Sequence, residues 1–460
     1  MEAFSLLVLL YTFQTSSKDQ NIFDIQQGVS VCFLIKRLNG EQDKKNVYHA
    51  DLYGKRDLKY DWLAKHDISN TKWQKVEPQS PFYLFIPQNN DLLPEYNRGW
   101  KVTDIFPVNG VGITTARDHV VIDFEEAPIL KRAQIFRDSV ESDQEVCHKL
   151  SIPVKLGWDI SRARQLIKAE DDLGQYIKPI MYRPFDCRYI FYHDSLIWRT
   201  VKKVMSHMLA GNNLGMSISR SVRGEPWRDV QVTNHIIEFG LMASRPGNSA
   251  PLFPLYLYPN TPGEIEMGIT RKTNISPEFL TKLEQNLRYT PVPEAIFHYI
   301  YAILHSPTYR SRYAEFLKID FPRVPLTRNV DLFRQLGELG EQLVNLHLMK
   351  YPILNQTSSP FIDNGGGCVI DAGHPKYESG KVVINKQKDG FMDVPEAVWN
   401  FHVGGYQVCQ KWLKDRKGRT LSQADIEHYQ KIVVALGQSI ELMAKIDAAI
   451  PNWPLDAEYN

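Results

Sequence analysis

The sequence predicts an α+β protein, in which a β-rich region is followed by a mainly helical region and preceded by a short remnant of a sheet. Up to residue 270, short apolar runs alternate with glycine, proline and asparagine turns, which is typical of strands. From Ser276 onwards, apolar residues recur at helical spacing. We therefore assign 1–66 to an incomplete sheet edge, 67–80 to a linker, 81–270 to the β-rich region and 271–460 to a helical region with a small β-insert.

Composition limits the possible functions. The 460 residues are enough for two or three domains, and the net charge is +1, so nucleic-acid binding would require local basic patches. An aromatic content of 11% reflects either core packing or rings that stack on bases. The five cysteines are scattered and odd in number, which argues against a disulfide framework or a zinc ribbon and favours a reducing, cytoplasmic location.

The first 66 residues are expected to form strands and one helix. The apolar run at 5–13 is too short for a bilayer, which takes about 20 residues, and it lacks the basic start of a signal peptide. We interpret it as a buried strand or helix, or as a damaged start. A short amphipathic helix is predicted from Lys55, with Leu58, Trp62 and Leu63 as its apolar residues. Strands are predicted at 22–25, 29–36 and 47–52.

A glycine-containing segment stands out at 110–118. Its glycines lack the G-x-G-x-x-G spacing and no helix pattern follows, so a nucleotide-cofactor loop is not supported. The segment is either a hairpin turn or a loop that contacts a nucleic-acid backbone through Thr114, Thr115 and Arg117.

The remaining elements follow from apolar spacing and capping residues. Asp159 is a suitable N-cap, and Ser276 followed by Pro277 has the chemistry of a helix start. Helices are predicted at 127–150, 159–168, 200–209, 293–304, 309–317, 330–347 and 422–446. Strands are predicted at 119–124, 213–219, 230–232 and 236–239, with the β-insert at 368–385.

Several catalytic motifs are absent from the sequence. It contains no G-x-x-x-x-G-K-S/T motif, no Asn-Pro-Pro-aromatic loop, no H-E-x-x-H and no G-x-S-x-G. The 13 histidines show no spacing typical of metal ligands. The residues alone therefore indicate a binding module or a fragment of an enzyme, and we assign no catalytic, cofactor-binding or metal site.

The stretch from Ile180 to Arg223 alternates arginines with aromatic residues and asparagines. A strand there would bury one face and present guanidinium groups on the other. Guanidinium groups suit phosphates and guanine, and asparagine suits adenine. The candidate DNA contacts are therefore Arg183, Arg188, Arg199, Asn212, Asn213, Arg220 and Arg223, with Lys411, Lys414 and Arg416 from a basic stretch at 411–419. Two alternatives stay open: Arg183 and Asp186 form an internal ion pair, and 411–419 is a solvated face.

Several sequence blocks occur in the order found in one protein family. They are Asn21–Val29, Gly112–Asp118, Tyr182–Arg188, Phe253–Tyr256, His305–Arg310, Asp320–Leu326 and Gly404–Arg416. Together they resemble the C-terminal part of a Type ISP restriction–modification enzyme, from about residue 21 to the end of the chain.

The resemblance implies that residues 21–66 correspond to the last strands of an N6-adenine methyltransferase sheet, and that the rest is a specificity domain. Double-stranded DNA is then the expected partner, with a separate methyltransferase or motor polypeptide as a second one. No cofactor is expected on this chain, because S-adenosylmethionine, ATP and Mg would belong to upstream domains.

We expect a sequence-specific DNA-binding module that directs adenine methylation and cleavage by other domains and is inactive alone. The alternatives are a protein-interaction subunit that completes a separate methyltransferase chain, and a complete DNA methyltransferase or nuclease.

Overall fold

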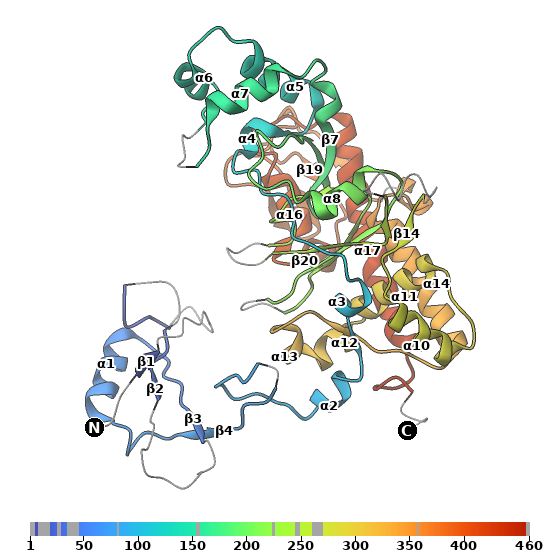
Figure 1. Cartoon of the computed structure of the whole chain (residues 1–460). Helices are drawn as coiled ribbons and strands as arrows, with labels where there is room; N and C mark the ends of the chain where they lie inside the picture. The colour runs from blue at the N-terminus through green and yellow to red at the C-terminus, as the bar shows by residue number, and fades with distance from the viewer. Residues whose placement is uncertain are drawn as a thin grey trace. The chain divides into compact units, whose positions relative to one another are not determined.

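A computed structural model gives the fold of the chain (Figure 1). It describes residues 5–7, 19–24, 29–34, 46–80, 82–152, 157–222, 226–243, 249–259, 270–356 and 358–456. The chain divides into two compact units, Met1–Pro94 with Val222–Pro226, and Glu95–Ser221 with Trp227–Asn460. Strands and helices alternate in the second unit before long helices take over, which confirms the predicted α+β class.

The first unit contains two antiparallel strand pairs and a helix. The pairs are β1 (Ser5–Leu7) with β2 (Cys32–Leu34), and β3 (Val47–His49) with β4 (Gln74–Val76), and the helix is α1 (Arg56–Lys65). The strand predicted at 22–25 is wrong for residues 22–24, which form a bend. The guanidinium group of Arg56 holds this bend by donating to the Asn21 carbonyl and the Asp24 carboxylate, both at 2.7 Å.

Two sheets form the β-rich part of the second unit. The four-stranded sheet has the order β11-β7-β8-β6, and the three-stranded sheet has the order β10-β9-β12. Their strands are β6 (Ile122–Asp123), β7 (Ile177–Arg183), β8 (Asp186–Phe191), β9 (Gly215–Ile218), β10 (Val230–Thr233), β11 (Ile236–Ile237) and β12 (Leu252–Pro254). The strands of the second sheet are buried along their whole length, so this sheet lies within the core.

Two further predicted elements differ from the structure. The strand predicted at 119–124 is the short helix α4 (Asp118–Val121) followed by β6, because packing of the β-branched residues overrides their strand preference. The helix predicted at 127–150 is two helices, α5 (Glu126–Asp138) and α6 (Asp143–Lys149). Ser142 and Glu145 form a capping box that starts the second one.

The C-terminal helices follow the predicted pattern, except that the helix predicted at 309–317 is two short helices. The C-terminal helices are α10 (Pro277–Leu287), α11 (Pro293–His305), α12 (Pro307–Arg312), α13 (Ala314–Leu317), α14 (Val330–His347) and α17 (Gln423–Ala449). Ser276 caps α10 as predicted, since its side chain accepts from the Phe279 amide. Helices α11, α14 and α17 pack together and bury their apolar side chains.

The small β-insert forms a sheet of order β16-β19-β18-β17. Its strands are β16 (Phe361–Ile362), β17 (Lys376–Glu378), β18 (Lys381–Val383) and β19 (Gly390–Phe391). The other helices are α2 (Leu93–Tyr96), α3 (Val102–Ile105), α7 (Ile160–Lys168), α8 (Lys202–Leu209), α15 (Glu396–Trp399) and α16 (Val408–Lys414), and 3-10 turns occur at Gly174–Tyr176 and Pro352–Asn355. The other strands are β5 (Trp100–Lys101), β13 (Tyr256–Leu257), β14 (Lys272–Thr273), β15 (Arg323–Val324), β20 (His402–Val403) and β21 (Tyr406–Gln407). No helix within the described residues has both the length and the apolar character needed to cross a membrane.

Candidate nucleic-acid interface

The β7–β8 hairpin and α16 meet in a cluster of paired charges. Asp186 is almost fully buried and accepts hydrogen bonds from Arg188 at 2.7 Å and from Arg416 at 2.8 Å. Arg188 also lies 3.3 Å from a carboxylate oxygen of Asp415. We call these four residues the Asp186 cluster. It fastens the hairpin to the C-terminal end of α16.

Aromatic rings cover the guanidinium groups of the Asp186 cluster. The guanidinium carbon of Arg188 lies 4.0 Å from the centre of the Tyr182 ring and 4.2 Å from that of Phe124. The corresponding atom of Arg416 lies 3.5 Å from the ring centre of Trp412. Burial acts to raise the pKa of Asp186, but Arg416 and Arg188 outweigh it and hold that pKa below its usual value. The carboxylate is therefore ionised, and it occupies both arginines inside the protein.

The prediction that these guanidinium groups face outward is wrong. Arg183 has a side chain only 13% exposed, and it pairs with Glu238 rather than with Asp186. Arg188 and Arg416 are 10% and 6% exposed, because buried arginines require carboxylate partners. Lys411 is partly buried and lies 2.6 Å from Asp415. These four cations stabilise the fold and have little surface left for a phosphate.

Three polar candidates are also buried. Thr115 hydrogen-bonds the Asp118 carboxylate, and Arg117 lies on the Trp158 ring at 3.7 Å and donates to the Leu196 carbonyl. Asn213 donates to two backbone carbonyls and accepts from two backbone amides, which joins the end of α8 to β13. Their side chains position loops, so the structure corrects their assignment to an outer face.

The segment 110–118 is neither a hairpin turn nor a glycine loop. It forms single bridges to three distant partners, Gly110 to Leu252, Ile113 to Glu238 and Thr114 to Arg199, before a left-handed residue at Ala116 and the start of α4 at Asp118. Gly112 is required there, because a Cβ at this position would lie 2.5 Å from the Glu238 carbonyl oxygen. The segment therefore sets the position of Thr114 beside Arg199.

The half-buried Thr114 and the exposed Trp198 and Arg199 form an edge, which we call the Trp198 edge. Backbone bonds of 2.9 and 3.1 Å join Thr114 and Arg199 in both directions. The Trp198 side chain is 48% exposed. Arg199 is exposed, and within the described residues its side chain forms no ion pair. The edge thus offers a ring for stacking next to a guanidinium group for a phosphate.

Sequence reasoning selected Thr114 and Arg199 but missed Trp198 as a contact. No sequence pattern distinguishes an exposed tryptophan from a buried one, and most are buried. The available signal was the adjacency of Trp198 to an arginine.

The remaining described candidates are exposed and have no hydrogen bond or ion pair with the Trp198 edge. Arg220 is 62% exposed and donates to Asp320 at 3.0 Å through Nε. Asn212 is exposed beyond α8, and Lys414 is exposed on α16 with a hydrogen bond to Gln410. Arg223 lies outside the described residues. The structure therefore does not gather the predicted cations on a single face.

Comparisons with known proteins add to this geometry. The family model of the Type ISP C-terminal specificity domain matches residues 104–445. A search of curated proteins found no match.

Solved structures share the fold. A nuclease-deletion mutant of the Type ISP restriction–modification enzyme LlaGI, in complex with a DNA substrate mimic, has 20% identity and a TM-score of 0.64, over 92% of this chain and 34% of that chain. The DrdV–DNA complex has 18% identity and a TM-score of 0.71, over 96% and 48%. The ATP-dependent Type ISP enzyme LlaBIII bound to DNA has 18% identity and a TM-score of 0.69, over 98% and 31%.

This chain corresponds to less than half the length of each of these solved chains. Its family match, in contrast, covers most of its own length, from the segment before the glycine-containing loop to the end of α17. The chain therefore belongs to the Type ISP C-terminal specificity domain family.

Proposed function

We propose that this chain is the DNA target-recognition module of a restriction–modification enzyme. The observation that carries the proposal is the family match over residues 104–445, which includes the whole Trp198 edge. The three similar structures named above are DNA complexes, which supports duplex DNA as the partner of this chain as well. Because that partner is cellular DNA, we also propose a cytoplasmic location.

Adenine methylation and cleavage would be carried out by other domains. S-adenosylmethionine, ATP and Mg would then bind to those domains and not to this chain. This chain would bind a defined DNA sequence. Contacts to phosphates would fix the position of the duplex, and contacts to bases would give the specificity.

The Trp198 edge is the most suitable DNA contact among the candidates. The Arg199 guanidinium group is free to bind a phosphate or a guanine edge, and Trp198 offers an apolar face beside it. Arg220, Lys414 and Asn212 are exposed and would add contacts elsewhere, and Arg223 remains a candidate from the sequence. The buried residues of the predicted set are not proposed as DNA contacts.

The test is duplex binding by the full chain and by an Arg199→Ala variant. A labelled panel of duplexes should be retained at low salt, and the variant should bind about tenfold more weakly, since a hydrogen bond to a charged group contributes about 1.5–3 kcal/mol. Fluorescence anisotropy against salt measures both. Trp198→Ala should also weaken duplex binding relative to the parent chain if the Trp198 ring stacks on a base.

Arg334→Ala is the matched control, because Arg334 is also an exposed arginine but lies on α14. It should bind DNA like the parent chain. Equal loss in both arginine variants, or no retention of any duplex at low salt, would contradict the proposal.

A second role is favoured by the apolar surface of the first unit. Among the described residues from 19 to 94, Val76 is the only buried hydrophobic side chain. The large apolar residues exposed there are Phe23, Val31, Phe33, Tyr48, Tyr53, Leu58, Tyr60, Leu63, Ile68, Trp73, Phe82, Tyr83 and Phe85. Such a concentration of exposed apolar surface is typical of an interface. The unit would complete a methyltransferase sheet supplied by other sequence.

Gel filtration with a candidate methyltransferase polypeptide tests this second role. Leu58→Lys on α1 should abolish co-elution, whereas Val292→Lys, at an equally exposed apolar site in the second unit, should leave it intact. Co-elution that survives Leu58→Lys would count against the first unit as the interface.

A further inference from the structure

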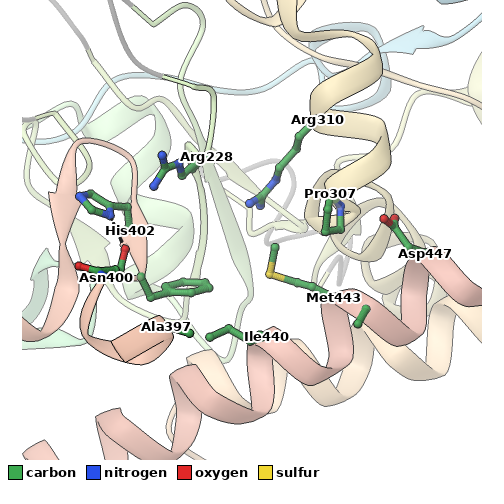
Figure 2. A pocket seen from close by; sticks show the side chains of 11 residues that line it. Arg228, Pro307, Arg310, Ala397, Asn400, His402, Ile440, Met443 and Asp447 are labelled. Atoms are coloured by element: carbon green, nitrogen blue, oxygen red, sulfur yellow. Dashed lines mark hydrogen bonds between the residues drawn. The ribbon is translucent and has the colours of Figure 1, made fainter. Parts of the chain in front are cut away.

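A pocket of about 630 Å³ lies within the second unit, away from the Trp198 edge (Figure 2). Four segments build it: the chain before β10, the start of α12, the loop between α15 and β20, and the C-terminal part of α17. Its size falls in the range of about 300–1,000 Å³ that is usual for small-molecule sites.

This pocket contains two arginines, Arg228 and Arg310. Both residues line it, and Figure 2 shows the guanidinium group of Arg310 directed toward Met443 and that of Arg228 on the side of the pocket where His402 lies. Nε of Arg310 donates to the Leu304 carbonyl at 2.7 Å, which fixes its planar group and leaves the two terminal nitrogens for another partner. Arg228 is held beside the β20–β21 turn, because its carbonyl accepts from the Gly404 amide at 3.1 Å.

Neither arginine forms an ion pair within the described part of the chain. The nearby carboxylates have other partners. Asp447 accepts from the Thr308 amide at 3.0 Å and from its hydroxyl at 2.7 Å, and it also bonds Ser306. Asp229 accepts from the Ser219 hydroxyl at 2.9 Å. The positive charge of the pocket is therefore not neutralised by a direct partner.

Burial lowers the pKa of Arg310 to about 10. The like charge of Arg228 acts in the same direction, whereas Tyr301, Asp229 and the pocket-lining Asp447 act to raise this pKa without contacting the guanidinium group. Arg310 nevertheless remains charged at neutral pH. Two charged guanidinium groups facing one cavity would be stabilised by an anion that bonds both.

The other walls of the pocket are apolar. Ile440 and Met443 of α17 lie below the arginines in Figure 2, and Phe401 also lines the pocket. All three side chains are only partly buried, so they present surface to an occupant. Methionine and aromatic side chains suit a flat ring. One cavity thus offers contacts both for an anionic group and for a flat apolar ring of the same ligand.

We propose that this pocket binds a nucleoside monophosphate-sized ligand, with its phosphate on Arg228 and Arg310 and its ring against Phe401 and Met443. The partly apolar lining favours a small ligand that carries a ring over a duplex backbone, which would place only sugars and phosphates against Ile440, Met443 and Phe401. This site is separate from the proposed DNA contact, so either proposal can fail without the other.

The experiment is titration calorimetry of the full chain with AMP, adenosine and inorganic phosphate at low salt. AMP should bind saturably at one site, and more tightly than either fragment. Arg228→Gln should weaken AMP binding about tenfold or more, as expected for the loss of a charge-assisted hydrogen bond. Ala444→Phe, which fills the pocket from the exposed face of α17, should abolish AMP binding.

Arg334→Gln on α14 is the matched control and should bind AMP like the parent chain. If Arg310→Gln does not fold, Arg228→Gln and Ala444→Phe decide the outcome. Absence of saturable AMP binding, adenosine or phosphate binding as tightly as AMP, or equal loss in the control would overturn the proposal. Displacement of AMP by a short duplex through Arg228 would assign the pocket to DNA phosphates and overturn the small-ligand site.

Discussion

Asp186 is the residue on which the position of the β7–β8 hairpin depends. It lies in the interior between two guanidinium groups, one from its own strand and one that follows α16. A buried charge pair contributes little net stability, but removing one partner leaves the other charge buried and uncompensated. The net attraction that Asp186 supplies is therefore small. Its removal would still be costly, because two buried arginines would lose their partner.

Asp186→Ala should lower the free energy of unfolding by about 3–5 kcal/mol, because Arg188 and Arg416 would both lose their buried partner. Urea unfolding measures it. Glu315→Ala is a suitable control, because its pair with Lys318 is solvent-exposed and should contribute less than about 1 kcal/mol. Similar losses in both variants would show that burial of Asp186 is not the cause.

The sequence left an ion pair between Arg183 and Asp186 open as an alternative, but each residue pairs with a different partner. The carboxylate that pairs with Arg183 is 55 residues away, and the second arginine on Asp186 is 230 residues away. Such partners are chosen by tertiary packing, and no local spacing encodes them. Thr114 and Arg199 were selected for their chemistry, and the backbone bridge that joins them was not foreseen.

At the scale of elements, one hydrogen-bonded chain links β10, α11, α14 and α17. The Val232 amide donates to the Tyr301 hydroxyl, and that hydroxyl donates to Nδ1 of His347 at 2.5 Å. Nε2 of His347 then donates to Ser439 at 2.9 Å, and Ser439 donates to the Ala435 carbonyl at 2.7 Å. Every group is satisfied only while His347 is neutral, because Nδ1 must accept.

Stability should therefore fall with acid. Burial lowers the pKa of His347 to about 3, whereas an unfolded histidine titrates near its ordinary value. Between about pH 6.5 and 3 the unfolded chain binds the extra proton, which costs the folded state about 1.4 kcal/mol per pH unit per group. The His347 contribution should leave the midpoint of unfolding independent of pH above about pH 6.5 and should lower that midpoint as the pH falls below this value.

His347→Met tests the assignment by removing the titrating group. The variant should show a shallower decline between pH 6.5 and 4 than the parent chain. Some decline should remain, since burial also lowers the pKa of His305. An unchanged slope in His347→Met would contradict the role given to His347.

The contact between α11 and α14 depends on a glycine. A Cβ at Gly340 would lie 2.0 Å from the His298 carbonyl oxygen, a backbone atom that cannot move aside alone. Gly340→Ala should therefore destabilise the protein by about 1–3 kcal/mol, as overpacking usually does. Gly337→Ala, one turn earlier on the same helix, would meet its nearest atom at 3.9 Å and should be neutral or stabilising. Thermal unfolding of both variants gives the comparison.

Helices were predictable where capping chemistry and apolar spacing agreed. The bounds of α14 match the prediction, and Asp159 and Ser276 cap the helices expected from them. The sequence also contained the signal that divides 127–150 into two helices, because Ser142 and Glu145 have the spacing of a capping box. The apolar spacing continues across this position, so one helix was predicted. The run at 119–124 misled because strand preference is weaker than packing.

At the scale of the molecule, the near-neutral charge is reflected in how the arginines are used. Most of the predicted DNA-binding cations in the described residues are neutralised by carboxylates or buried against rings. Composition alone could not distinguish cations that hold the fold from cations that face solvent. A protein of this kind would bind DNA through few phosphates and would depend on base contacts and on other domains for affinity.

The salt dependence of duplex binding measures how many cations take part. The logarithm of the binding constant falls with the logarithm of salt concentration with a slope of about −0.9 per neutralised phosphate. If Arg199, Arg220 and Lys414 supply the contacts, the slope should be about −3. If all nine cations proposed from the sequence took part, it would be about −8. Anisotropy titrations across a range of salt concentrations distinguish the two values, and a slope near the larger one would mean that the buried arginines rearrange to meet DNA.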